Sequence, residues 1–288
     1  MSSNKARLTF LGTGTSQGIP MIGCDCPVCT SPDPRNRRLR ASAFIEYCGL
    51  SILVDAGPDF RYQMLRAGIR HIDAVLLTHN HKDHTGGLDD VRSFNLIEHH
   101  PVNIYCMDYV KQSLKGEYPY AFTEVLYPGA PEIKVHTIDG KAPFKVHSNT
   151  VEDWLEWESG FGYVHRPAEE PLDIEAEIVP IFGWHHKKKT LPVLGYRFGN
   201  IAYLTDISML EDGEIEKLKG VEYVTLGCVK IQAHHSHPSL QQCLDFFEKV
   251  GAKTSYITHM SHLLPGYEEF DRMLPENVHP AYDGLVIE

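Results

Sequence analysis

The chain has 288 residues, 42% of them hydrophobic, and a formal net charge of −11. That is enough for one large domain with a sizeable core, and the acidic balance disfavours broad electrostatic binding to nucleic acid. Because the sequence lacks an apolar run of 18 residues and its N-terminus lacks the apolar region of a signal peptide, we expect a cytoplasmic protein without a membrane span.

Short apolar runs and longer mixed stretches predict strands and helices respectively. In chain order we expect a strand and Gly-rich turn at 6–18, paired strands at 41–47 and 50–57, a helix at 59–69, a strand at 72–79, a helix at 83–100 and a strand at 101–106. Further on we expect a strand at 173–183, a hairpin at 193–208 that turns at Gly199 and Asn200, a helix at 211–220, a strand at 221–227, a helix at 239–251 and a strand at 253–259. This alternation predicts a layered α/β fold with the helices outside.

One segment stands apart from this alternation. Residues 146–172 are rich in aromatic and acidic side chains and have no clean period. Three interpretations stay open, namely a lid over a site, a dimer contact and a surface excursion. We otherwise expect a single domain over residues 1–288.

The stretch THNHKDH, residues 78–84, places three histidines and an aspartate at the end of an apolar run. His79 and His81 are two residues apart, so in extended chain they point the same way and can share one metal ion. Asp83 and His84 follow where the chain leaves the strand, and they can bind a second ion nearby. Imidazole and carboxylate ligands suit zinc, manganese, iron or nickel.

A cysteine cluster suggests a further metal site. Cys24, Cys26 and Cys29 lie within six residues, whereas the other four of the seven cysteines are scattered. In a cytosolic chain such clustering indicates metal binding more than disulfides. Buried free thiols and a redox pair are the alternatives.

THNHKDH resembles the signature of the metallo-β-lactamase superfamily, which implies a four-layer αββα sandwich with a metal site at one edge. The resemblance implies Asp206 of YLTDIS as a ligand that bridges two metals and His259 of YITHMSH as the last histidine. The related pattern places a single histidine directly after an apolar strand end, so it implies His185, in preference to His186, as the remaining ligand, with Lys187–Lys189 as a small insertion. We expect His79, His81 and His185 at one ion, and Asp83, His84 and His259 at the other.

Charge counting indicates the substrate. Two divalent ions, zinc or manganese or else nickel or iron, contribute four positive charges. Asp83, Asp206 and a bridging hydroxide contribute three negative ones, so the site keeps about one positive charge and suits an anion.

The stretch FLGTGTSQGIPMIGCDCPVC resembles the N-terminus of the phosphoribosyl cyclic phosphodiesterases of phosphonate catabolism. This narrower resemblance implies a structural zinc held by Cys24, Cys26, Cys29 and His262, with no open coordination position. It also implies that His237 of HHSHPSL lies beside the metals, where it donates a proton to the leaving oxygen or holds a phosphate oxygen. His234 and His235 are rival candidates for that role.

The resemblance as a whole implies a phosphodiesterase that acts on a small cyclic phosphate through a metal-bridging hydroxide, with Asp83 and His237 required for catalysis. The alternatives are a nuclease like the tRNA 3′-end endonucleases, an acyl hydrolase of thioesters or lactones, and a non-catalytic biosynthetic partner. The expected partner is a small anionic phosphate ester, and a homodimer is the commonest oligomer.

Two further features have competing interpretations. Asp55, at the end of an apolar strand, either orients a metal ligand or caps a turn. The basic run of Arg35, Arg37, Arg38 and Arg40 either contacts phosphate or is a solvated loop.

Overall fold

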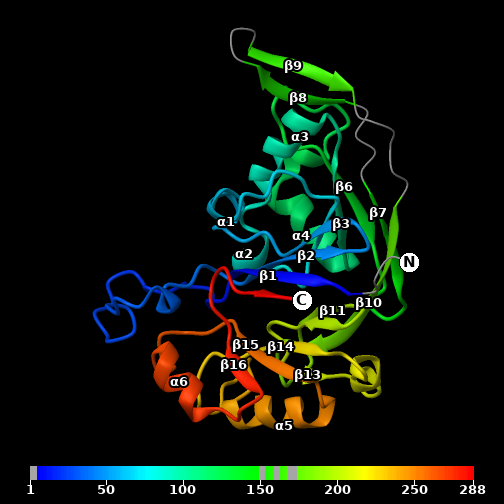
Figure 1. Cartoon of the computed structure of the whole chain (residues 1–288). Helices are drawn as coiled ribbons and strands as arrows, with labels where there is room; N and C mark the ends of the chain where they lie inside the picture. Colours follow the sequence, from blue (N-terminus) through cyan, green and yellow to red (C-terminus); the bar gives the residue numbers. More distant parts are fainter. Residues whose placement is uncertain (1–4, 149–152, 159–161, 168–173) are drawn as a thin grey trace.

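The computed structural model describes residues 5–148, 153–158, 162–167 and 174–288. Within these ranges the strands form two large sheets and a two-stranded one (Figure 1). The first large sheet has the order β17-β1-β2-β3-β4-β5-β6, and its strands are β1 (Arg7–Gly12), β2 (Ser42–Tyr47), β3 (Leu50–Val54), β4 (Ala74–Leu76), β5 (Val102–Cys106), β6 (Ile133–Thr137) and β17 (Val286–Ile287).

The second large sheet has the order β13-β10-β11-β12-β14-β15-β16, and β7 pairs with β10 beside this path. Its strands are β7 (Phe144–His147), β10 (Glu175–Trp184), β11 (Pro192–Phe198), β12 (Ile201–Tyr203), β13 (Met209–Leu210), β14 (Tyr223–Gly227), β15 (Thr254–Thr258) and β16 (Val278–Pro280). The two sheets face each other across fully buried aromatic rings, such as Phe10 of β1 and Tyr203 of β12, whose centroids are 6.3 Å apart.

Helices cover the outer face of each large sheet. α1 (Phe60–Ala67), α3 (Arg92–Glu98) and α4 (Asp108–Glu117) pack on the first sheet, and α5 (Leu240–Val250) and α6 (Tyr267–Met273) pack on the second (Figure 1). The expected αββα sandwich is therefore confirmed. In the described ranges no helix has the length and apolar character that crossing a bilayer requires.

The helix expected at 83–100 is wrong in detail. The structure has a short α2 (Lys82–Thr85), a 3-10 helix η2 (Leu88–Val91) and then α3, because Gly86 and Gly87 interrupt the first helix. A Cβ atom at Gly87 would lie 2.1 Å from the carbonyl oxygen of Gly57, so this glycine lets the chain pack against the loop after β3. Likewise, 211–220 forms only a 3-10 helix, η4 (Glu214–Leu218).

The segment at 146–172 contains more regular structure than its composition suggests. β8 (Asp153–Glu158) and β9 (Gly162–Pro167) form an antiparallel hairpin that lies beside α3. Residues 149–152, 159–161 and 168–172 of this segment lie outside the described residues. Its role as a lid or a dimer contact stays a prediction.

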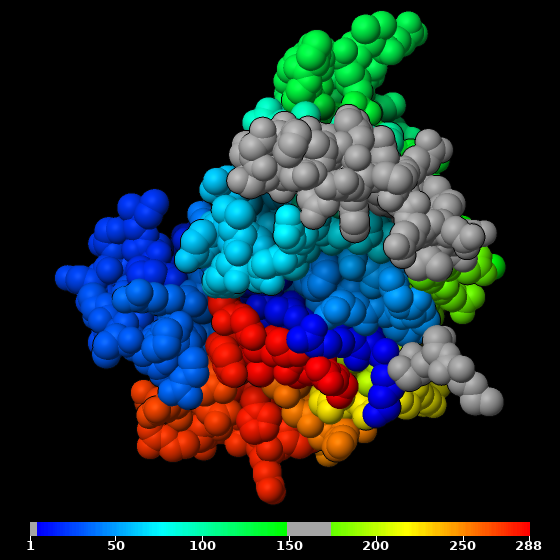
Figure 2. Space-filling view, turned by 45° about the horizontal axis from the view of Figure 1, so that its top comes forward, coloured from blue at the N-terminus to red at the C-terminus, as the bar shows by residue number. Residues whose placement is uncertain are grey.

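The basic run anchors the loop between β1 and β2, residues 13–41, which we call the N-terminal loop. Arg35 forms ion pairs with Asp33 and with Glu268 near the C-terminus, at 2.8 and 2.9 Å. Arg38 is buried and donates a 2.8 Å hydrogen bond to the hydroxyl of Thr13. Figure 2 shows this blue loop against the orange and red residues of the C-terminal part. These two arginines hold the loop in place, which neither interpretation of the run anticipated.

A charged cluster ties the end of α3 to the loop before β4. The carboxylate of Glu98 lies 3.0 Å from Nδ1 of His71 and 2.8 Å from Nε2 of His100, and Asp73 lies 3.2 Å from Nε2 of His71. Burial disfavours a charged His71, but hydrogen bonds to Asp73 and Glu98 outweigh burial and raise the pKa of His71 to about 10. Burial likewise opposes charge on Glu98, but His100 and His71 lower the pKa of this carboxyl.

Replacing Glu98 with Gln is expected to lower the free energy of unfolding by about 2 kcal/mol at pH 6, where the carboxylate and the cationic His71 are both present. The pKa of His71 is raised in the folded state. The contribution of His71 to the free energy of unfolding is therefore complete at pH values below its pKa in the unfolded chain, and it is lost as pH rises through about 10. Urea unfolding of the wild type and Glu98→Gln from pH 6 to 10 measures this. The exposed Glu124→Gln serves as control, and a difference that stays constant with pH contradicts the prediction.

Candidate metal centre

The candidate ligands follow the ends of strands that terminate at adjoining sheet edges. β3 to β6 run parallel in the first sheet, and β12, β14 and β15 run parallel in the second. The carboxyl ends of parallel strands meet at one edge, so short loops after them bring side chains from distant parts of the sequence together. Six side chains of the site follow the carboxyl end of one of these strands or of β10. They are Asp55 after β3, His79 and His81 after β4, Asp206 after β12, His259 after β15 and His185 after β10.

The structure brings the seven expected ligands into two adjoining groups. Ligand atoms of His79, His81 and His185 lie within 4.8 Å of one another, and so do those of Asp83, His84 and His259. Asp206 lies between the groups. Its Oδ2 atom is 2.9 Å from Nε2 of His84 and 3.2 Å from Nε2 of His259, and its Oδ1 atom is 3.9 Å from Nε2 of His185.

His185, and not its neighbour His186, points into the site. His185 is only 4% exposed, and its Nδ1 atom lies 2.9 Å from the carbonyl oxygen of Ser236. A carbonyl only accepts, so Nδ1 is the donor in this hydrogen bond, and Nε2 is the nitrogen that can face a metal ion. His186 is half-buried and belongs to none of the candidate metal groups among the described residues.

Hydrogen bonds to the outward-facing nitrogens fix two more imidazoles. Nδ1 of His84 lies 2.7 Å from Asp55, and Nδ1 of His79 lies 2.9 Å from the hydroxyl of Thr78. Thr78 also donates its amide and hydroxyl protons to the two carboxylate oxygens of Asp55, at 2.8 and 2.9 Å. Asp55 therefore orients a candidate ligand and the strand end together, as the first of its two interpretations predicts.

The inward-facing atoms fit a metal centre. The Nε2 atom of His79 is buried and has no hydrogen-bond partner, and the buried Nε2 atoms of His84 and His259 face the Asp206 carboxylate at 2.9 and 3.2 Å without hydrogen-bond geometry. A buried polar atom without a partner costs about 1–3 kcal/mol. Metal ions bound at these nitrogens would satisfy all of them.

The charges around His84 point to the same conclusion. Burial disfavours the cation, but Asp55, Asp83 and Asp206 outweigh burial and hold the pKa of His84 well above its usual value. In the metal-free chain a proton on His84 thus balances part of this negative charge. Two effects, burial first and the charge of His84 second, hold the pKa of His79 well below its usual value. The imidazole of His79 therefore stays neutral and able to bind a metal.

Backbone strain is concentrated at this edge. Asp55, Asp206 and His259 have φ angles of 62°, 53° and 51°, in the left-handed region that non-glycine residues rarely adopt. Such conformations cost about 1–3 kcal/mol each and persist where the surrounding structure requires them. Here they turn side chains from three strand ends into the same site.

His237 lies beside the candidate ligands, as the resemblance implies. Its Nδ1 atom is 3.3 Å from Oδ1 of Asp206 and has no hydrogen-bond partner. Burial lowers the pKa of His237 to about 3, which leaves a neutral imidazole in the metal-free chain. The rivals His234 and His235 lie farther out, half-buried and exposed respectively.

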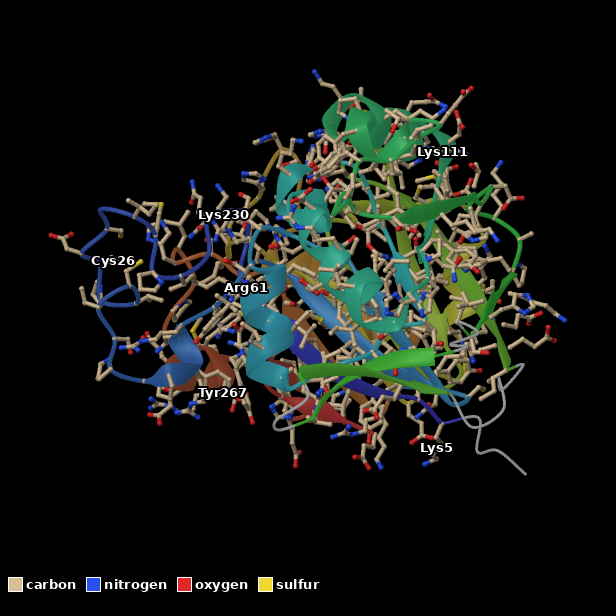
Figure 3. The ribbon with its side chains drawn as sticks, turned by 90° about the horizontal axis from the view of Figure 1, so that it is seen from above. Lys5, Cys26, Arg61, Lys111, Lys230 and Tyr267 are labelled. Atoms are coloured by element: carbon tan, nitrogen blue, oxygen red, sulfur yellow. The ribbon has the colours of Figure 1, made fainter. Side chains whose placement is uncertain are left out.

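The cysteine cluster forms a second, separate group with His262. Nδ1 of His262 lies 3.2 Å from Sγ of Cys24 and 3.4 Å from Sγ of Cys26, and Cys29 completes the set. The amide of Cys29, followed by His262, lowers the pKa of Cys26 to about 6, which favours the thiolate that binds metal. Figure 3 shows Cys26 on the loop that projects from the molecule.

We call the site formed by the seven expected ligands the first centre. Backbone hydrogen bonds join the N-terminal loop to its edge. The amide of Met260 donates to the carbonyl of Thr13 at 2.8 Å, and the amide of Thr15 donates back to Met260 at 2.9 Å. Met260 directly follows His259, so a metal held by Cys24, Cys26, Cys29 and His262 would stabilise the position of a ligand of the other centre.

Sequence reasoning missed two groups that orient the ligands. Thr78 is the first letter of the metal motif, and its hydroxyl next to a histidine is the signal that was overlooked. Ser236 acts through its backbone carbonyl, so no side-chain pattern announces it.

Comparison with known proteins agrees with this geometry. A family described as the beta-lactamase superfamily domain matches residues 51–260, well over half of the chain. A solved structure described as a new diphosphatase from the PhnP family is 35% identical, covers 98% of this chain and 96% of its own, and superposes with a TM-score of 0.79.

Two curated relatives match this chain over part of their own length. The octanoyltransferase of Porphyromonas gingivalis is 37% identical over 97% of this chain, but the match spans 51% of that protein. The coenzyme PQQ synthesis protein B of Methylobacterium radiotolerans is 27% identical over 54% of this chain and 60% of its own length. The chain thus spans about half or somewhat more of these relatives.

Replacing Asp55 with Asn is expected to weaken metal affinity at the first centre about 10–100-fold, because the amide no longer provides the charge that orients His84. Competition with a chromogenic chelator measures the affinity. Asp59→Asn, which removes an ion pair with Arg40 in the same loop, is the matched control. Equal affinity in Asp55→Asn and the wild type would contradict the assigned role.

Elemental analysis of the purified chain is expected to find about three metal ions, two at the first centre and one at the cysteine group. Cys26→Ser is expected to lose one of them and to lower the melting temperature. The scattered Cys48→Ser should keep all three. An unchanged zinc content in Cys26→Ser would show that the cysteines hold no ion.

Proposed function

The chain belongs to the beta-lactamase superfamily and, within it, to the PhnP family, and from this premise we propose that it is a phosphodiesterase acting on a small phosphate ester. The observation that supports the proposal is the complete set of seven candidate metal ligands at the adjoining edges of the two sheets, with His237 beside them. A small cyclic phosphate is the favoured substrate, and zinc or manganese the favoured ions.

The donor set assigns roles to the residues. His79, His81 and His185 would hold one ion, Asp83, His84 and His259 the other, and Asp206 would bridge them. Two divalent ions held there supply Lewis acidity towards a phosphoryl oxygen and lower the pKa of water towards neutrality.

The remaining residues orient these ligands and meet the substrate. Asp55, Thr78 and the Ser236 carbonyl keep the ligands in place before substrate binds, so no reorganisation is needed during the reaction. His237, with an unpaired Nδ1 atom, either donates an N–H hydrogen bond to a phosphoryl oxygen or protonates the leaving oxygen.

An acyl hydrolase is the second candidate, because one relative that matches nearly the whole chain is named an octanoyltransferase. The same site would then attack a thioester carbonyl. The endonuclease alternative is disfavoured by the net charge of −11. A non-catalytic role is disfavoured by the complete set of ligands.

The first test uses bis(p-nitrophenyl) phosphate and octanoyl-coenzyme A with the metal-loaded chain. Hydrolysis of the phosphodiester, lost about 10³-fold or more in Asp83→Ala, is expected if two ions stabilise the transition state. Asp90→Ala, seven residues along, is the control and should retain activity. Turnover of the thioester alone would replace the phosphodiesterase proposal with the acyl hydrolase.

The role of His237 is tested with two leaving groups. If His237 protonates the leaving oxygen, His237→Ala is expected to slow hydrolysis of an alkyl phosphodiester about 10²-fold while sparing a p-nitrophenyl ester, whose leaving group needs no proton. Equal loss on both esters would assign His237 to the phosphoryl oxygen. No loss on either would remove it from the reaction.

A further inference from the structure

His259 differs from other histidines of the first centre in what orients its ring. The outer nitrogens of His79, His84 and His185 are each held by a neighbouring group, at 2.9, 2.7 and 2.9 Å. The outer Nδ1 atom of His259 is buried and has no hydrogen-bond partner within the described part of the chain, while its Nε2 atom faces Asp206 at 3.2 Å. The position of this candidate ligand therefore depends on its backbone and on packing.

The backbone at His259 is strained and is held by the N-terminal loop. Its φ angle of 51° persists only where the surroundings require it. The next residue, Met260, donates its amide to the carbonyl of Thr13 at 2.8 Å and accepts at its carbonyl from the amide of Thr15 at 2.9 Å. Gly14, between these two threonines, pairs with Met260 in a parallel β-bridge. The loop thus fixes the residue that follows the strained histidine.

The carboxylate of Asp283 holds this part of the loop. Asp283 lies between β16 and β17, and its side chain is only 4% exposed. Its Oδ1 atom accepts hydrogen bonds from the amide and the hydroxyl of Thr13, at 2.9 and 2.8 Å, and its Oδ2 atom accepts from the amide of Leu39 at 2.8 Å. One carboxylate therefore joins the two arms of the N-terminal loop at the point where the first arm meets Met260. Figure 2 shows the red C-terminal residues against the blue N-terminal ones.

Two arginines complete this network. Nη1 of Arg66 in α1 lies 3.2 Å from Oδ2 of Asp283, and the buried Arg38 donates to the hydroxyl of Thr13 at 2.8 Å. A buried carboxylate is costly unless it is paired and hydrogen-bonded. The hydrogen bonds that satisfy Asp283 come from the loop and from α1. The burial of this charge is thus linked to the placement of the loop.

We propose that Asp283 is a positioning residue for the candidate ligand His259 and acts through Thr13 and Met260. The inference rests on the metal centre of the proposed function, but it does not depend on which substrate that centre hydrolyses. The carboxylate fixes Thr13, and the carbonyl of Thr13 fixes the amide of Met260. That amide belongs to the peptide bond that leaves His259, so its direction limits how the imidazole can point.

Stepwise metal binding, measured by competition with a chromogenic chelator, is the first test. Asp283→Asn keeps one acceptor oxygen and turns an NH2 group towards the amide of Thr13 or Leu39. The binding step that His259→Ala abolishes is expected to weaken about tenfold in Asp283→Asn. The step that His81→Ala abolishes should keep its affinity. A carboxylate that only stabilised the fold would weaken both steps alike, which would overturn the proposal.

Hydrogen exchange of the metal-free chain tests the contact itself. In Asp283→Asn the amide of Met260 is expected to exchange about five- to tenfold faster than in the wild type, the size of one weakened hydrogen bond. The amide of Leu77, which donates to the carbonyl of Tyr105 at 3.0 Å beside β4, should keep its rate. Neither measurement uses turnover. A chain that hydrolyses no phosphodiester would therefore sink the proposed function and leave the role of Asp283 to be decided by these two results.

The matched control is Asp271→Asn, which removes a contact at 2.9 Å with Nδ1 of His279 in the same C-terminal part of the chain. It should change neither the stepwise affinities nor the exchange at Met260. Thr13→Val keeps the loop backbone but removes the hydroxyl that donates to Asp283, and it serves if Asp283→Asn does not fold. It is expected to weaken the same binding step about threefold. Wild-type affinities and exchange rates in Thr13→Val and Asp283→Asn would overturn the proposal.

Discussion

The convergence of three carboxylates on one imidazole is the constraint on which the rest of the site depends. Asp55, Asp83 and Asp206 lie 2.7, 3.3 and 2.9 Å from the nitrogens of His84, deep at the edge where the two sheets adjoin. Buried negative charge of this density is stable only beside cations. Several imidazole nitrogens face this charge without hydrogen-bond geometry, an arrangement that suits metal ions better than a proton.

The fold supports this edge from both ends of the sequence. The N-terminal loop reaches the strand end that carries His259 through paired backbone hydrogen bonds and through the cysteine group at His262. Arg35 and Arg38 hold the same loop with ion pairs and buried hydrogen bonds. Because this loop bonds to the residue that follows His259, the stability of the loop and the position of that candidate ligand are coupled.

Local patterns in the sequence predicted the strands that carry the candidate ligands. The apolar runs before His79, Asp206 and His259 indicated strands, and the structure places β4, β12 and β15 there. Regular structure was missed where the pattern is weak, as in α4, β6 and the β8–β9 hairpin. The helix predicted at 83–100 is broken because Gly87 packs against the Gly57 carbonyl, a contact between distant segments that periodicity does not report.

The sequence by itself determined which side chains are available for metal binding, since histidine, aspartate and cysteine in these spacings have few other uses. Only the tertiary structure decided how they are combined. It pointed His185, and not His186, into the site, and it placed Asp55 against Nδ1 of His84. The reason is physical: spacing along a strand fixes which way neighbouring residues point, whereas the meeting of residues over a hundred positions apart depends on how two sheets pack.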